Sequence, residues 1–190
     1  MKFKPSYTSS IAEDIMAERL IRAQAVEFLA DAPMRLKSGL ISPVYVDNRK
    51  LFSHPEAWRD IVETMASRVE EYDLEFDIVA GVEAAGSMHA AALAYRLGLP
   101  AIMVRQKAKT YGNHSRIEGG DVKGLRVLLL EDHISTGLSC LDAIRALREE
   151  GAQVTQVMSI TNYAIPETQR LFKQEGIDTY DVIAFEKVVH

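Results

Sequence analysis

One short stretch of the sequence concentrates residue types that suit a phosphorylated sugar. Four apolar residues at 127–130 precede two adjacent acids, Glu131 and Asp132, and a turn rich in hydroxyl groups and glycine follows at residues 135–139. Ligands of open α/β sheets bind at the carboxyl ends of strands, and the N–H groups of such a turn, with the start of the next helix, form an anion site. The acids suit sugar hydroxyls or a hydrated Mg²⁺ ion nearby. A phosphate site beside a diol site describes a ribose phosphate; the alternative interpretation is a capped helix start with two solvated acids.

A second stretch, residues 105–124, interrupts the regular pattern of the chain. It has little apolar periodicity, and it contains four glycines and five lysine or arginine residues. A polar loop of about twenty residues inside a compact domain is uncommon and is usually functional or mobile. We therefore expect a functional loop here, with a solvated excursion that carries incidental charge as the alternative.

The elements that must position these two stretches alternate between helical and extended patterns. Ser10 and Glu13 have the spacing of a capping box, and Pro55 suits the first turn of a helix. The expected helices cover residues 10–29, 55–72, 87–97 and 140–150 and begin again near 166; the expected strands cover residues 44–46, 77–80, 101–104, 126–130 and 154–160. This alternation predicts an α/β domain, residues 1–190, with a mostly parallel central sheet flanked by helices.

Composition and charge exclude several classes of protein. Hydrophobic residues make up 47% of the 190 residues, which is enough for one sizeable core and excludes general disorder. The net charge of −5 argues against a broad nucleic-acid surface, and the single cysteine, Cys140, allows neither an intrachain disulfide nor a cysteine-based zinc site. Neither a secretory signal nor a membrane-spanning run is evident. We therefore expect a cytoplasmic protein without nucleic-acid or membrane partners.

The stretch at 127–139 resembles the phosphoribosyl pyrophosphate (PRPP) signature of type I phosphoribosyltransferases. Two further stretches narrow the resemblance to orotate phosphoribosyltransferases. Residues 38–49, SGLISPVYVDNR, with SHPE at 53–56, are similar to the N-terminal segment of that family; RQKAKTYG at 105–112, with IEG at 117–119, is similar to its catalytic loop. The resemblance covers about Leu20 to about Phe172. It implies a type I phosphoribosyltransferase fold with a small N-terminal hood region, at about residues 1–50, and a flexible catalytic loop, at about residues 105–124.

The resemblance also implies roles for the matching residues. Glu131 and Asp132 would hold the ribose 2- and 3-hydroxyls of PRPP, and Ser135 would bind the 5-phosphate close to orotate. Arg105 and Lys109 would contact the pyrophosphate and, with Asp132, are the expected catalytic residues; Lys109 would act on the neighbouring subunit of a homodimer. The other implied substrate-binding residues are His133, Ile134, Thr136, Gly137, Leu138 and Ser139 of the signature, Tyr111 of the loop, Lys37 and Tyr45 of the orotate pocket, and Ala84 and Ala85 of the loop that faces pyrophosphate.

The implied reaction displaces pyrophosphate from the anomeric carbon of PRPP by a ring nitrogen of orotate. The sugar carbon gains positive character while the leaving group gains negative charge, so catalysis needs cations on the pyrophosphate. The resemblance implies Mg²⁺ as the cofactor, held by PRPP and water near Asp132 with no direct protein ligand assigned. A mobile loop that carries cations would also keep water from the activated sugar.

Several positions depart from the family pattern, among them Gln106, where some members carry lysine, and His133, which occupies an apolar position. Tyr111 stands where the family usually has histidine, and Leu138 replaces a common glycine, which requires a negative φ at that position. His133 is interpreted as a hydrogen-bonded residue, with proton donation as the alternative. Two other functions stay open: transfer to a different nucleobase, and PRPP sensing by a regulator without catalysis.

Overall fold

A computed structural model describes residues 9–29, 33–35, 39, 41–108 and 115–189 of the chain. Its centre is a six-stranded sheet with the strand order β10-β9-β8-β5-β6-β7. The strands are β5 (Ile78–Val82), β6 (Ala101–Val104), β7 (Ile117–Glu118), β8 (Arg126–Ile134), β9 (Gln153–Asn162) and β10 (Asp178–Ala184). All neighbours pair in parallel except β7, which is antiparallel to β6. The predicted mostly parallel sheet is confirmed.

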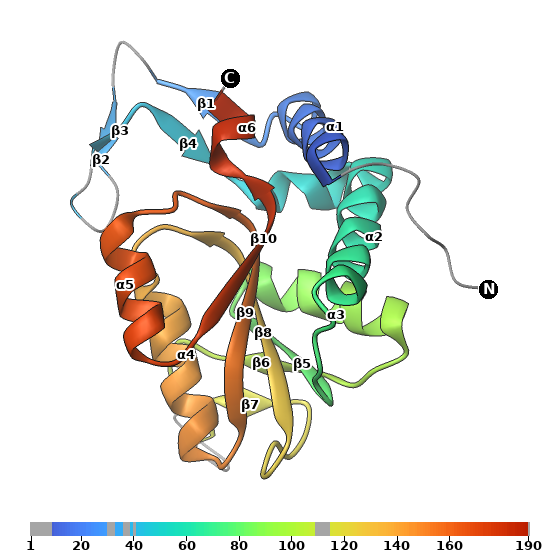
Figure 1. Ribbon diagram of the computed structural model, residues 1–190, viewed down its shortest axis with the longest axis vertical. Helices are drawn as coiled ribbons and strands as arrows, with labels where there is room; N and C mark the ends of the chain where they lie inside the picture. Colours follow the sequence, from blue (N-terminus) through green and yellow to red (C-terminus); the bar gives the residue numbers. More distant parts are fainter. Residues whose placement is uncertain (1–8, 30–32, 36–38, 40, 109–114, 190) are drawn as a thin grey trace.

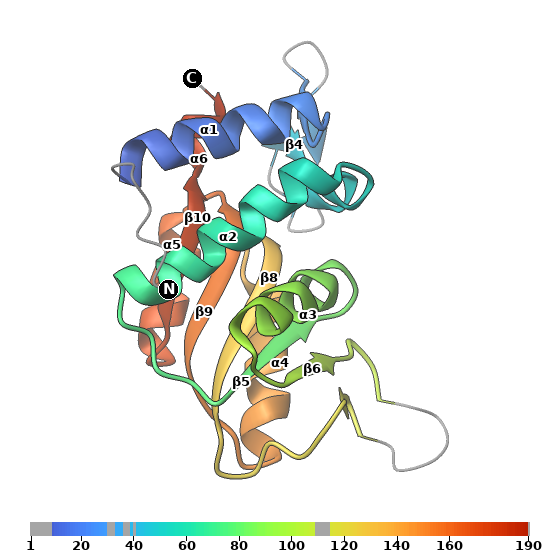
Figure 2. The same cartoon turned by 90° about the vertical axis from the view of Figure 1, so that its right-hand side faces the viewer.

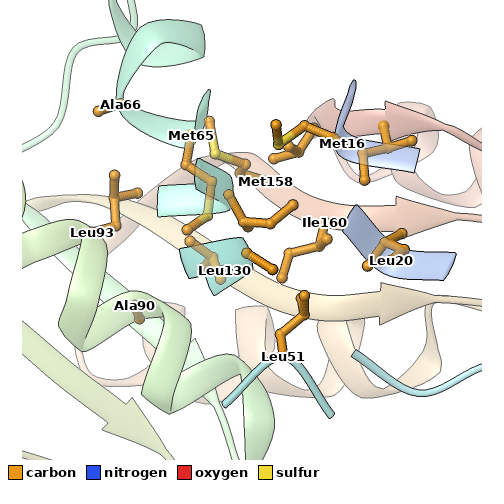
Figure 3. Packing of buried hydrophobic residues seen from close by; sticks show 14 of the residues in the cluster. Met16, Leu20, Leu51, Met65, Ala66, Ala90, Leu93, Leu130, Met158 and Ile160 are labelled. Carbon is orange, nitrogen blue, oxygen red and sulfur yellow. The ribbon is translucent and has the colours of Figure 1, made fainter. Parts of the chain in front are cut away.

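Helices cover both faces of this sheet (Figure 1). The helices α1 (Ser9–Arg22), α2 (Pro55–Glu71) and α3 (Ala85–Leu97) lie on one side, and α4 (Leu138–Glu149) and α5 (Pro166–Gln174) lie on the other; α6 (Phe185–Val189) follows β10. Side chains alternate along a strand, so Leu128 and Leu130 face the first layer while Val127 and Leu129 face the second. In Figure 3, Leu130 and Met158 of the sheet lie near Met65 of α2. Burial on both faces explains the continuous apolar runs in the sequence.

The strand order reverses between β5 and β8, the two central strands. From β5 the chain passes through α3 to β6 in one direction, and from β8 it passes through α4 to β9 in the other. The view in Figure 2 shows α3 and α4 on opposite sides of the sheet. The loops that leave the carboxyl ends of β5 and β8 therefore diverge, and such a point is where open α/β sheets bind ligands.

The described parts of the N-terminal segment, residues 26–53, lie at the carboxyl-end edge of the sheet (Figures 1 and 2). They form two antiparallel pairs and a short 3₁₀ helix. The pairs are β1 (Val26–Phe28) with β4 (Val44–Val46) and β2 (Met34–Arg35) with β3 (Ile41–Ser42), and the helix is η1 (Asn48–Ser53). The predicted strand at 44–46 and the predicted helix start at Pro55 are confirmed.

The structure corrects two predicted boundaries and adds elements that the sequence did not indicate. The first helix does not continue to Leu29 but ends at Arg22, because Gln24 has a left-handed φ of 54° and Val26–Phe28 pair with β4. The strand predicted at residues 126–130 does not end at residue 130 but runs through both acids to Ile134, because β9 continues to pair with it. The strands β7 and β10 and the helix α6 were not predicted, since pairing partners and packing rather than local pattern define them.

No helix in the described ranges combines the length and the apolar character that a bilayer crossing requires.

Candidate functional site

The loop that follows β5 is pressed against the end of β8. A Cβ atom on Gly86 would lie 2.6 Å from the carbonyl oxygen of Leu130 and 3.3 Å from Oε1 of Glu131, so only a residue without a side chain fits there. This close approach brings Ala84 and Ala85, which precede Gly86, to the edge of the acid pair. The structure thus brings together two stretches that lie almost fifty residues apart in the sequence.

The turn between β8 and α4 forms a small concave site. Glu131 and residues 133–140 line a hollow at this point. Gly137 caps α4 with a left-handed φ of 71°, and a Cβ atom there would lie 2.9 Å from Cζ of Phe172. The hydroxyl of Thr168 donates to the carbonyl of Ser135 at 3.0 Å and fixes the start of the turn. Main-chain N–H groups at the start of α4 are left to bind an anion.

Leu138 fits this turn without strain. It is the first residue of α4, and its φ is not positive; in the described ranges only Gln24, Asp73 and Ala164 are non-glycine residues with positive φ. The negative φ that the sequence required is therefore present. Its side chain is 63% exposed, so it does not fill the hollow.

Glu131 is buried in the lining of the hollow, and Asp132, next to it, is half-buried. Glu131 is 7% exposed, and its Oε1 accepts a hydrogen bond from the N–H of Asp132 at 3.1 Å. Burial, and then the neighbouring Asp132 carboxylate, raise the pKa of Glu131 well above its usual value. Burial also raises the pKa of Asp132, although the positive charge of Arg49 acts in the opposite direction. Two carboxylates with raised pKa values favour incoming hydroxyl donors or a cation.

His133 is a hydrogen-bonded residue, as the sequence analysis favoured. Its Nδ1 lies 2.9 Å from the hydroxyl oxygen of Thr161, and its ring packs edge-on against Tyr163 at 4.3 Å between centroids. Burial lowers the pKa of His133 to about 4. The imidazole is therefore neutral near pH 7, which does not suit the alternative role of proton donor.

The connection between β6 and β7 begins beside the loop after β5. Gln106 donates from its main-chain N–H to Oε2 of Glu83 at 3.1 Å and from its side chain to the Glu83 carbonyl at 3.2 Å. The guanidinium of Arg105 forms an ion pair with Glu118 at 2.9 Å. Arg105 also lines a second hollow, which shares Leu138 and Ser139 with the first. The predicted site residues Lys109 and Tyr111 lie outside the described residues.

The N-terminal segment closes the other side of the site. Tyr45 is half-buried on β4, and its hydroxyl lies 3.5 Å from Nη2 of Arg49, at the limit of a hydrogen bond. Tyr163, at the end of β9, donates its hydroxyl proton to the carbonyl of Val44 at 2.8 Å and fastens β4 to the sheet. The predicted orotate-pocket residue Lys37 lies outside the described residues.

Comparisons with known proteins agree with this geometry. Residues 47–188 match the phosphoribosyl transferase domain family. The chain is 43% identical over 174 residues to an orotate phosphoribosyltransferase of Coxiella burnetii, a match that covers 92% of this chain and 83% of that protein. The chain belongs to the orotate phosphoribosyltransferase family.

Solved structures of this family have the same fold. The orotate phosphoribosyltransferase from Aeropyrum pernix is 27% identical with a TM-score of 0.80, and the match covers 92% of this chain and 96% of that one. The Mycobacterium tuberculosis enzyme, solved in complex with PRPP, is 26% identical with a TM-score of 0.72, covering 94% and 99%. The predicted type I phosphoribosyltransferase fold is confirmed.

Sequence reasoning gave no role to several residues that the structure places at the site. Asn48 and Arg49 belong to the N-terminal motif that resembles the family, and Thr161 and Tyr163 lie just beyond the strand predicted at residues 154–160. The rule that ligands bind at the carboxyl ends of strands points to Thr161 and Tyr163. Nothing local in the sequence indicates that Asn48 reaches the sheet.

Proposed function

We propose that the protein transfers the phosphoribosyl group of PRPP to orotate and releases orotidine 5′-phosphate and pyrophosphate, a step of pyrimidine biosynthesis. The observation that carries the proposal is the acid pair, one member buried and one half-buried, beside a turn suited to an anion, at the point where the strand order reverses. Family membership supports orotate as the acceptor, because the relatives that match most of the chain are orotate phosphoribosyltransferases.

PRPP would bind across the two central strands. The carboxylates of Glu131 and Asp132 accept hydrogen bonds from the ribose 2- and 3-hydroxyls, and the turn at residues 135–139 holds the 5-phosphate with its N–H and hydroxyl groups. The main chain at Ala84 and Ala85 faces the pyrophosphate, since Gly86 brings that loop onto the end of β8. The sugar thus spans the two loops that the fold brings together.

Displacement at the anomeric carbon needs positive charge on the leaving group. Arg105 and Lys109 supply that charge, and the pyrimidine nitrogen of orotate reacts as an anion, so a general base is not required. Water must be excluded because it would hydrolyse the activated sugar. The N-terminal segment covers one side of the site, and residues 105–124 would cover the other.

The acid pair also fits a magnesium ion. A buried and a half-buried carboxylate, both with raised pKa values, gain from a nearby divalent cation, and oxygen is the ligand atom that Mg²⁺ prefers. Within the described ranges no three His, Cys, Asp or Glu side chains cluster as metal ligands. The ion would therefore be held chiefly by PRPP and water near Asp132, where it would neutralise charge on the pyrophosphate.

The proposed active form is a homodimer in which Lys109 acts on the neighbouring subunit. The ion pair between Arg105 and Glu118 holds the start of this loop within its own subunit. A cytoplasmic location and the absence of a nucleic-acid partner stay predictions from the sequence.

The decisive assay mixes the protein with PRPP, Mg²⁺ and orotate and follows orotate by its ultraviolet absorbance. Orotate should disappear with release of an equal amount of pyrophosphate. Turnover with a purine base and none with orotate would select another nucleobase. PRPP binding without turnover on any base would select a sensing regulator.

A further inference from the structure

Asn48 is a buried side chain that joins the N-terminal segment to the ribose site. It is fully buried at the start of η1. Its amide nitrogen donates to the main-chain carbonyl of Asp132 at 2.6 Å and to the hydroxyl oxygen of Thr161 at 2.8 Å. One side chain from residue 48 thus ties together the ends of β8 and β9.

The orientation of this amide is determined by its partners. A main-chain carbonyl only accepts hydrogen bonds, so the nitrogen of Asn48 must face Asp132. Thr161 accepts the second bond with its oxygen, and the same oxygen lies 2.9 Å from Nδ1 of His133. The three residues therefore form a connected chain of hydrogen bonds.

This contact lies where the sheet itself no longer supports β8 on one side. The pairing of β5 with β8 ends at Gly81 and Leu130, before the acid pair begins. Beyond that point β8 has only β9 as its neighbour in the sheet. The amide of Asn48 supplies the Asp132 carbonyl with a hydrogen bond there.

The neighbours of Asn48 link it to the predicted nucleobase pocket. Asp47 holds the guanidinium of Arg49 through both carboxylate oxygens, at 2.6 and 2.8 Å. Arg49 in turn approaches the hydroxyl of Tyr45 and acts electrostatically on Asp132. Movement of this short segment would therefore reach both Tyr45 and Asp132.

We propose that Asn48 is a positioning residue that fixes Asp132 relative to the N-terminal segment, so that the ribose site and the nucleobase pocket depend on each other. The proposal rests on the proposed function, whose failure shows separately as absent turnover by the unmodified protein. Asn48 does not touch the reacting atoms in this account. It acts through the main chain of Asp132.

The test compares Asn48→Ala, Asn48→Asp and the control Ser53→Ala, which removes an exposed hydroxyl that bonds only within η1. Loss of the amide should lower kcat/KM for PRPP by about 10- to 100-fold in Asn48→Ala, with kcat reduced as well as KM raised. Ser53→Ala should match the parent. Activity of Asn48→Ala within twofold of the parent, in a folded protein, would overturn the proposal.

The aspartate variant supplies a readout that a packing role would not move. A carboxylate cannot donate to the Asp132 carbonyl, whereas a protonated carboxyl group can. The kcat/KM of Asn48→Asp, divided by that of the parent, should therefore rise from pH 8 to pH 5.5, while the same ratio for Asn48→Ala stays flat. The titratable groups around position 48 are Asp47, Arg49, Asp132 and His133. These groups are present in the variant and in the parent, so dividing the two kcat/KM values removes the pH dependence that they share. Equal ratios for both variants at every pH would contradict the proposal.

A second pair of variants decides the matter if the Asn48 variants do not fold. Thr161→Val removes the hydroxyl that accepts from Asn48 and bonds Nδ1 of His133, whereas Thr161→Ser keeps it. Thr161→Val should lose more kcat/KM for PRPP than Thr161→Ser, by about 3- to 10-fold. Equal activities of the two variants would overturn the proposal.

Discussion

The two sides of the crevice handle charge in opposite ways. At the end of β8, Glu131 and Asp132 are largely buried, and their pKa values are raised. At the end of β6, the guanidinium groups of Arg105 and Arg116 are part-exposed and pair with Glu118 and Asp142, at 2.9 and 2.5 Å. Among the described residues neither acid has an ion-pair partner, whereas each of the two arginines pairs with a carboxylate.

This difference indicates that the acid side is fixed in place, whereas the arginine side can exchange its carboxylate partner for a ligand. An exposed ion pair contributes only about 0–1 kcal/mol, so a pyrophosphate can replace Glu118 at little cost. Buried carboxylates without a compensating cation lower stability, and that cost is retained where a ligand needs them. The acid side, Glu131 and Asp132, therefore defines where the sugar binds, and the basic side, which contains Arg105, binds the pyrophosphate as it leaves.

The largest expected effect comes from removing the cation that would cross between subunits. Lys109→Ala should lower kcat by about 100- to 1000-fold, because it removes charge stabilisation that forms in the transition state. Its Tm should stay within a degree or two of the parent, measured by calorimetry. An equal loss of stability would contradict an exposed catalytic loop.

The same variant tests the shared site. Asp132→Asn should also be nearly inactive, because it removes a charged acceptor from the sugar. In a symmetric dimer with exchanged subunits, mixing the Lys109→Ala and Asp132→Asn proteins should restore about a quarter of the sites. If native mass spectrometry shows mixed dimers and no activity returns, each subunit works alone.

A smaller effect should separate the two arginines. Arg105→Ala should lower kcat/KM for PRPP by about tenfold, because Arg105 can exchange Glu118 for pyrophosphate. Arg116→Ala is the matched control: its guanidinium also bonds the Arg105 carbonyl, so it serves the base of the loop rather than the leaving group. We expect a loss below about threefold. Equal losses would mean that the charge of the region, and not Arg105 itself, is what matters.

The smallest expected effect is on stability, and it is a gain: Glu131→Gln should stabilise the protein, whereas the variants above lose activity. Folding raises the pKa of Glu131, so ionisation above the usual value of 4.5 costs stability, and this cost grows until the pH passes the folded pKa. Glu131→Gln removes that cost and still accepts the Asp132 N–H. It should be more stable than the parent at pH 8 by about 1 kcal/mol, or about 2–4 °C in Tm, with the gain shrinking toward pH 4. A lower Tm at pH 8 would contradict the raised pKa.

The structure around Glu131 and Asp132 could be predicted from the sequence more completely than the rest of the molecule. The run from residue 127 to residue 139 is local, so its order of apolar residues, acids and turn predicts a strand end beside an anion site without knowledge of the fold. The central strands followed from the same kind of pattern. The extension of β8 through the acids did not, because pairing with β9 and not propensity holds Glu131 and Asp132 in a strand.

Long-range contacts explain what the sequence left out. Asn48 reaches Asp132 across 84 positions of the chain, and Tyr163 reaches Val44 across 119. The same is true of β10, whose strand character depends on pairing with β9. The sequence named the residues of the N-terminal motif by resemblance, but only the fold shows which of them touch the sheet.

The most direct test of the central claim is a crystal structure of the protein soaked with ribose 5-phosphate. The phosphate should lie in the turn at residues 135–139, hydrogen-bonded to its N–H groups, and the sugar hydroxyls should donate hydrogen bonds to Glu131 and Asp132. An empty turn at saturating ligand, or a sugar bound with its hydroxyls away from both acids, would contradict this claim.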